Sequence, residues 1–223
     1  MTATKTREKL SRERICEAAL QVMDAEGLDA VSMRRVARVV GVEAMSLYHH
    51  VQDKEDLLDG ICSLVMGEFN YPDESQAWID VAKQGAQEWR RVLKQHPNVI
   101  ALFAERQKPM TDVAALGPME FALRVIGRAG IDERETVLVF NVLGGYIMGS
   151  VMMEVGRMFN AGAMDKANPD VAATLVNFPA NQLPCIAASM PHLAACDPNE
   201  QFETGLDLLL QGLITRYGTP ADA

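Results

Sequence analysis

Residues 32–50, SMRRVARVVGVEAMSLYHH, predict two short helices joined by a tight turn, and no other feature constrains the fold of the chain as strongly. The first helix is expected over residues 33–40 and the second over residues 43–50. Gly41 lies between them and can adopt the positive φ that such a turn demands. Ala37, four residues earlier, is small enough to let the two helices cross closely. This spacing is that of a helix-turn-helix.

The helices around this turn carry capping and periodicity signals. Ser11, Ser32 and Asp53 are suited to accept a hydrogen bond at the start of a helix, and Gly27 is suited to end one. Val42 and Leu47 are expected to attach the third helix to the core. The expected inward faces are Ile15, Ala18, Ala19, Val22 and Met23 in the first helix, Val36, Ala37 and Val40 in the second, and Leu57, Leu58, Ile61, Leu64 and Val65 in a fourth helix over residues 54–70.

The rest of the chain is also expected to be helical, because strand signals are scarce. Half of the ten prolines lie between residues 169 and 198, which predicts a loop with one or two short helical pieces. Tyr71-Pro72-Asp73 is the best candidate for a boundary. We therefore predict an all-α fold with an N-terminal helix-turn-helix domain at residues 1–71 and a larger helical domain at residues 72–223. The further helices are predicted at residues 75–95, 97–106, 112–129, 132–160 and 199–217.

Charge is distributed unevenly along the chain, whose net charge is -9. Residues 1–14 carry five Lys or Arg against two Asp or Glu, and residues 1–50 carry eight against seven. The remainder is therefore acidic. A basic tip on an acidic body is compatible with nucleic-acid contact only at the tip, and a flexible basic start is the alternative interpretation.

Several other classes of site receive little support. The four cysteines (Cys16, Cys62, Cys185 and Cys196) form no CxxC pair, which favours a reducing, cytoplasmic compartment over a disulfide framework or a zinc site. We expect no metal and no cofactor. Residues 137–153 lack charge, but a membrane span needs about twenty apolar residues. Asn141 and the glycines Gly144, Gly145 and Gly149 favour a buried helix that another backbone approaches closely.

Residues 11–65 resemble the DNA-binding domain of the tetracycline-repressor (TetR) family. The likeness rests on VSMRRVARVVGVEAMSLYHHVQDKEDLL, residues 31–58. In the family a turn glycine is followed by L-Y-x-H-[FV] and then by K-x-x-L-L, and this chain supplies them as Gly41, residues 47–51 and residues 54–58.

The likeness extends into the second half of the chain. FETGLDLLLQGL, residues 202–213, is similar to the last helix of the tetracycline-repressor-like subclass. The expected helix at residues 132–160 matches in position and apolar character. Between about residues 75 and 130 the likeness is one of helix order more than of residues.

The resemblance implies that residues 43–50 form a recognition helix that enters the major groove of DNA. Arg34 can hold guanine O6 and N7 with two hydrogen bonds, and Ala44 and Met45 are expected to touch thymine methyl groups. The expected base-contacting residues are Arg34, Ala44, Met45, Ser46 and His49, and the expected phosphate contacts are Tyr48 and Lys54. Each also has an ordinary interpretation as a solvated charge or a packing residue.

The two adjacent histidines are best interpreted separately. Neighbouring residues on a helix point about 100° apart, so His49 and His50 cannot both face one metal ion. We expect His49 to face DNA and His50 to lie at the joint with the fourth helix.

The resemblance also implies a small-molecule pocket in the acidic body, whose filling releases the operator. The tetracycline repressor uses a pocket histidine to help hold a magnesium-tetracycline complex. Here His96 alone lies between His50 and His192, and it is expected to end a helix before Pro97. We therefore expect a metal-free, largely apolar effector. The candidate lining residues are Trp89, Leu93, Phe103, Arg106, Met110, Met119, Phe140, Asn141, Tyr146 and Met152, any of which can instead be an ordinary core residue.

One helix-turn-helix reads too few bases for useful specificity, so we expect a homodimer formed through the helices at about residues 132–160 and 199–217. Three other interpretations stay open. An enzyme is disfavoured because no short catalytic or phosphate-binding motif is present. A helical protein-interaction module that does not read DNA and a transcriptional activator are the other two.

Overall fold

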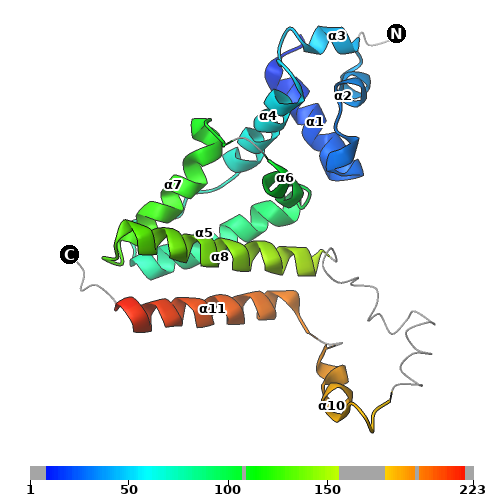
Figure 1. Cartoon of the computed structure of the whole chain (residues 1–223). Coiled ribbons are helices and arrows are strands. Elements are labelled where there is room, and N and C mark those ends of the chain that lie inside the picture. The colour runs from blue at the N-terminus through cyan, green and yellow to red at the C-terminus, as the bar shows by residue number, and fades with distance from the viewer. Residues whose placement is uncertain (1–8, 107–108, 156–178, 194–195, 219–223) are drawn as a thin grey trace, which may run out of the picture. The chain divides into compact units, whose positions relative to one another are not determined.

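The computed structural model describes residues 9–106, 109–155, 179–193 and 196–218. Within these ranges the chain forms helices, turns and loops, and no residue lies in a β-strand (Figure 1). Contacts divide the chain into two compact units, residues 1–71 with 95–121 and residues 72–94 with 122–223. The predicted all-α fold is confirmed. The domain boundary at residue 71 stays a prediction.

Four helices form what we call the head. They are α1 (Arg12–Glu26), α2 (Met33–Val40), α3 (Ala44–Leu47) and α4 (Lys54–Gly67). Helix α1 packs against both α2 and α4, and α3 packs against α2. The buried side chains are largely those of the predicted inward faces, among them Ile15, Met23, Val36, Leu47, Leu57 and Ile61.

The predicted start signals are confirmed by hydrogen bonds. The Ser11 hydroxyl accepts from the amide of Arg14 at 3.3 Å, and the Asp53 carboxylate accepts from that of Asp56 at 2.8 Å. Ser32 caps α2 in the same way. Gly41 has φ 80° and ψ 39°, the left-handed conformation that the turn requires.

The length of one helix in the head differs from the prediction. The third helix spans only Ala44–Leu47, because the amides of His50 and Val51 both donate to the carbonyl of Leu47 and close the chain into a turn. As predicted, Gly27 ends α1: its φ is 90° and its amide donates to the carbonyl of Met23, and a short 3-10 helix, η1 (Leu28–Ala30), follows it.

The first unit also contains α6 (Val99–Glu105) and the first part of α7 (Val113–Gly127). Three aromatic rings pack together beside them: Phe69 and Tyr71 have centroids 5.1 Å apart, and Phe121 lies 5.7 and 5.5 Å from these two rings. Through this cluster, the segment that follows α4 packs against α7.

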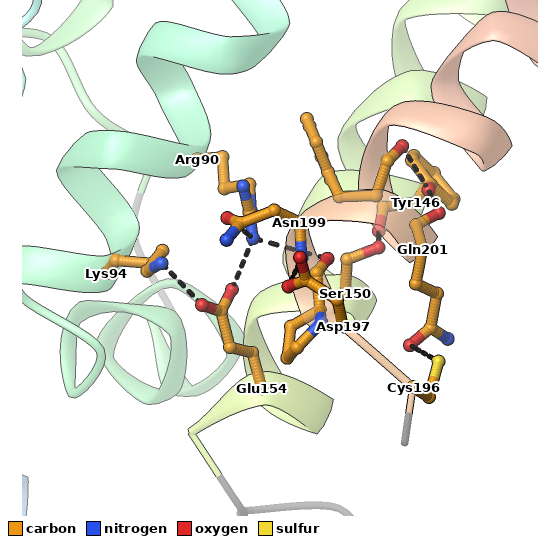
Figure 2. Close-up of polar contacts among 11 residues, drawn as sticks. Arg90, Lys94, Tyr146, Ser150, Glu154, Cys196, Asp197, Asn199 and Gln201 are labelled. Carbon is orange, nitrogen blue, oxygen red and sulfur yellow. Dashed lines mark hydrogen bonds and ion pairs between the residues drawn. The ribbon is translucent and has the colours of Figure 1, made fainter. Parts of the chain in front are cut away.

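The second unit contains α5 (Trp78–Gln95), α8 (Glu133–Glu154), α10 (Pro184–Leu193) and α11 (Pro198–Tyr217). Helices α8 and α11 lie side by side (Figure 1). Tyr146 of α8 stacks on Phe202 of α11, and its hydroxyl donates to the carbonyl of Phe202 at 2.8 Å (Figure 2). The predicted residues 156–160 of the α8 helix lie outside the described residues.

A buried ion pair links three helices of this unit (Figure 2). Arg90 of α5 donates to the Glu154 carboxylate of α8 at 2.8 Å and to the Asn199 side chain of α11 at 3.0 Å. Lys94 also pairs with Glu154, and the Arg90 guanidinium lies over the Phe202 ring. Removing one member of a buried pair of this kind costs about 3–5 kcal/mol, because it strands the other charge.

Helix α8 is the one helix in the described ranges that is long and apolar enough to cross a membrane by length and composition alone. Only about a quarter of its most apolar window (28%) is buried within the chain. Gly144, Gly145 and Gly149 have no heavy atom within 4 Å of an added Cβ, so the close backbone approach expected there does not occur within the described chain. Asn141, expected to be buried, is exposed.

Gly60 of α4 is required for the contact between α1 and α4. A Cβ at this position would lie 2.2 Å from the Sγ of Cys16, which is itself 2% exposed. We expect Gly60→Ala to lower the free energy of unfolding by about 1–3 kcal/mol in urea denaturation, through overpacking.

A matched control lies on the same helix. Gly67 has no heavy atom within 4 Å of an added Cβ, so Gly67→Ala should stabilise the helix by up to about 1 kcal/mol. The double variant Cys16→Ala/Gly60→Ala removes the clashing Sγ and should regain much of the loss. Equal stability of Gly60→Ala and Gly67→Ala would show that the contact is not as close as described.

Candidate nucleic-acid interface

Ion pairs fix the frame that carries α3. Arg12, at the start of α1, donates to the carboxylate of Asp56 at 2.8 Å and to its carbonyl at 3.3 Å. The other carboxylate oxygen of Asp56 accepts the amide of Gln52 at 2.7 Å. The loop between α3 and α4 is therefore tied to the start of α1 through one carboxylate.

The adjacent arginines Arg34 and Arg35 have different roles. Arg35 grips both carboxylate oxygens of Glu26, with its Nε 3.1 and 3.0 Å away, and so joins α2 to the end of α1. This bond lowers the pKa of Glu26, so the contact persists at neutral pH and is lost only in acid as Glu26 gains a proton. Arg34 is exposed and forms no hydrogen bond or ion pair with any described residue. Its guanidinium is thus available for an external partner.

The buried Leu47 attaches α3 to the core, and the predicted contact residues in and directly after this helix lie nearer the surface. Leu47 is fully buried and holds the helix to the core, whereas Met45 is 73% exposed. Tyr48 and His49 are exposed, and Ala44 and Ser46 are half-buried. An exposed methionine this large has no role in the core, which suits it to an apolar external contact.

The start of α4 offers an exposed lysine beside a capped helix end. Lys54 is exposed, but the amide of Asp56 is already taken by the cap residue Asp53. That amide is therefore not available to a phosphate beside Lys54. His50 is half-buried in the turn that precedes the buried Val51.

Comparison with known proteins connects this geometry to a family. Residues 15–61 match the family described as "Bacterial regulatory proteins, tetR family". Residues 71–217 match "Tetracyclin repressor-like, C-terminal domain". The chain belongs to the TetR family. It is a DNA-binding transcriptional regulator, and its relatives of known function are regulators rather than enzymes.

Three relatives illustrate the range of this TetR-family regulator's similarity. An HTH-type transcriptional regulator of Saccharopolyspora erythraea is 30% identical over 96% of this chain and 89% of its own length. The HTH-type transcriptional repressor DrrR1 of Streptomyces coeruleorubidus is 32% identical over 66% of this chain and 54% of its own. ActR of Streptomyces coelicolor in complex with actinorhodin is 25% identical, with a TM-score of 0.78 over 96% of this chain and 100% of that one.

The predicted effector residues of the TetR regulator divide between the two units. Those of the first unit are Phe103, Arg106, Met110 and Met119, of which Met119 is exposed and the others half-buried. Arg106 already pairs with Asp59 of α4 at 2.5 Å and lies 3.7 Å from the Sγ of Cys62. Burial raises the pKa of the Cys62 thiol, against the opposing effect of Arg106, so the thiol stays protonated at neutral pH.

Those of the second unit are Trp89, Leu93, Phe140, Asn141, Tyr146 and Met152. Leu93 is fully buried, and Trp89, Phe140 and Met152 are half-buried. Tyr146 uses its hydroxyl on the backbone of α11, and Asn141 is exposed beside Leu138 and Val142. The assignment of all ten residues to an effector site stays a prediction, as does the assignment of the DNA-contacting residues.

The different surroundings of Arg34 and Arg35 lead to a paired prediction. Arg34→Ala should cost about 1–3 kcal/mol of binding free energy to a selected duplex and relax the preference for guanine at one position of each half-site. The measurement is titration of duplexes substituted one base at a time.

Arg35→Ala is the control from the adjacent position. It breaks the contact with Glu26 and should lower the stability of the head while leaving the base preference of the remaining binding unchanged. If Arg34→Ala left the preference at every position intact, Arg34 would not be a base-reading residue.

Proposed function

We propose that this TetR-family regulator is a repressor that binds a palindromic operator as a homodimer and leaves it when a small, largely apolar effector binds. The observation that carries the DNA-binding part is the presentation of Arg34, Met45 and Tyr48. All three are exposed, and each lies in or directly after α2 or α3, which are held to the core by the buried Val36 and Leu47. Such rigid presentation of unpaired side chains is what base reading requires.

In this proposal the contacts fall into two groups. Arg34, Ala44, Met45, Ser46 and His49 approach base edges, and Tyr48 and Lys54 approach phosphates. The phosphate contacts set the register of the head, and the base contacts supply the sequence preference.

The proposed dimer rests on the outward face of α8 and α11. Val137, Leu138 and Val142 of α8 are all exposed, and Leu208 of α11 is 70% exposed. Apolar side chains of this number on adjoining helices are typical of a surface that another chain covers. The open surroundings of Gly144, Gly145 and Gly149 would let the helices of a second copy approach closely, in a four-helix contact.

Support for the proposed effector comes from composition and from relatives. The chain has thirteen methionines, and thioether side chains adapt to irregular apolar ligands. Among the structural neighbours, ActR has been crystallised with actinorhodin and with (S)-DNPA. The ten residues predicted from the sequence remain the proposed effector contacts. To release the operator, the effector must bind the non-DNA-binding conformation more tightly, by about 2.7 kcal/mol for a hundred-fold loss of affinity.

A mobility-shift titration with the intergenic DNA upstream of the gene tests the proposal. We expect specific binding whose logarithm falls linearly with the logarithm of salt concentration, with a slope of about -0.9 for each phosphate contact. Lys54→Ala should weaken binding to all duplexes alike and make the slope shallower by about one for each protomer. Absence of binding to any duplex would favour a protein-interaction module instead.

The same titration has an effector arm. Actinorhodin serves as the first probe, because it is the molecule crystallised with ActR. Release of the duplex by this probe or by another apolar polycyclic compound supports a ligand-controlled repressor. Binding of such a compound with no change in operator affinity would contradict the proposed release mechanism.

The dimer is tested by charge substitution on its proposed face. Leu208→Glu should convert the dimer to a monomer in light-scattering chromatography and reduce operator affinity, because a charge would be buried in an apolar contact. Val113→Glu is the control, since Val113 is also exposed but belongs to α7, which contributes no residue to the proposed face. An unchanged mass for folded Leu208→Glu, checked by circular dichroism, would place the interface elsewhere.

A further inference from the structure

His96 lies between α5 and α6, with its side chain 13% exposed. Its Nδ1 is 2.7 Å from a carboxylate oxygen of Asp24, in the last turn of α1. Its Nε2 is 3.1 Å from a carboxylate oxygen of Glu68, which directly follows α4. A single imidazole ring thus bridges the ends of the two longest helices of the head.

This arrangement constrains the protonation state of the ring. A neutral imidazole has one N–H donor and one lone-pair acceptor, whereas an ionised carboxylate only accepts. Both hydrogen bonds form together only when the ring is the doubly protonated imidazolium. Loss of one proton would turn one contact into a lone pair facing a carboxylate at about 3 Å, which is repulsive.

The contacts around His96 differ in whether they depend on the proton of the ring. Among the residues that the structure describes, the charged groups paired with the ring are Asp24 of α1 and Glu68, which follows α4. Helix α6 brings the uncharged Asn98, whose amide donates to the carbonyl of Met23 at 2.7 Å. Lys94, on the preceding helix, pairs with Glu154 instead. Asn98 anchors the start of α6 to α1 at any pH, whereas the His96 bridge depends on its proton.

The bridge lies where it can change the DNA-reading surface. Helices α1 and α4 pack on each other along their length, and α2 packs on α1. At their starting ends Arg12 joins them through Asp56, and at their other ends His96 joins them through Asp24 and Glu68. A change at one end would be transmitted through the packing of α1 against α4 and α2 to the turn and to α3.

We propose that His96 is a protonation-dependent clamp between the ends of α1 and α4, and that operator affinity falls as pH rises and the clamp opens. The imidazolium makes both bonds, so the clamp is present at lower pH and is lost as the proton leaves. The statement about the operator rests on the function proposed above. The statement about the clamp concerns the protein alone.

Substitution of the carboxylates provides a specific test. In Glu68→Gln the new amide can donate to a neutral ring nitrogen, while the other ring N–H still donates to Asp24. The clamp then needs no extra proton, and Asp24→Asn should have the same effect from the opposite side. His96→Gln cannot restore both bonds at any pH.

Operator affinity is measured for all four proteins at pH 6 and pH 8. Wild type should lose about 5- to 10-fold more affinity over this interval than His96→Gln, whose remaining pH dependence reports His49, His50 and other groups. Glu68→Gln and Asp24→Asn should show a pH dependence of operator affinity as shallow as that of His96→Gln. At pH 8 both should bind the operator more tightly than wild type does. Equal pH dependence of operator affinity in wild type and His96→Gln would overturn the coupling. A loss of operator affinity in Glu68→Gln and Asp24→Asn that is the same at pH 6 and pH 8 would also overturn it.

The protein alone is examined by nitrogen NMR of the imidazole rings, with the His96 signals identified by their absence in His96→Gln. Both ring nitrogens should carry protons at pH 6 in wild type, and Glu68→Gln should hold the ring neutral at a lower pH. A neutral His96 ring at pH 6 in wild type would overturn the clamp. Failure of every variant to bind DNA would instead contradict the proposed function, and the NMR result would still decide the clamp.

Discussion

The packing of α1 against both α2 and α4 is the constraint on which the rest of the head depends. Helix α1 buries Ile15, Val22 and Met23 completely or almost so, and every other element of the head is placed by contact with it or with a helix that touches it. Helix α3 has only four residues and cannot hold itself in place, because so short a helix has little stability of its own. The buried Leu47 and the turn at Gly41 therefore set the orientation of α3.

Charged side chains supplement this apolar contact at its edges. Arg12, Arg35 and His96 each reach from one helix end to a carboxylate on another. The more exposed pairs, those of Arg12 and Arg35, add little stability singly, about 0–1 kcal/mol, but they restrict how neighbouring helices can slide. The apolar core therefore provides most of the stability of the head, and the ion pairs fix its geometry.

The sequence was most informative where the physical signal is local. Caps at Ser11, Ser32 and Asp53 and the left-handed residue at Gly41 act within a few residues, and all four were predictable from residue type and spacing. Periodicity likewise located the inward faces of α1 and α4. The length of α3 was overestimated because the helix ends where the Leu47 carbonyl accepts hydrogen bonds from two amides, those of His50 and Val51. No residue preference predicts this turn.

Contacts between distant residues were not predictable in this way. His96 appeared only as a residue before Pro97, yet its partners are 72 and 28 positions away. Arg106 was predicted only as a lining residue of the effector pocket, and its pairing with Asp59 depends on where α6 ends relative to α4. Asn141 appeared as a buried polar residue because the sequence around it is apolar, although that apolar character belongs to an outward face.

The contact between Cys16 and Gly60 has a consequence for the history of the family. The two positions share the space of about one side-chain atom, so a larger residue at one requires a smaller residue at the other. Relatives that carry a side chain at the position of Gly60 should therefore have lost bulk at that of Cys16, and the two sites should vary as a pair. In this chain the junction therefore accommodates a larger side chain at one position only where the other becomes smaller.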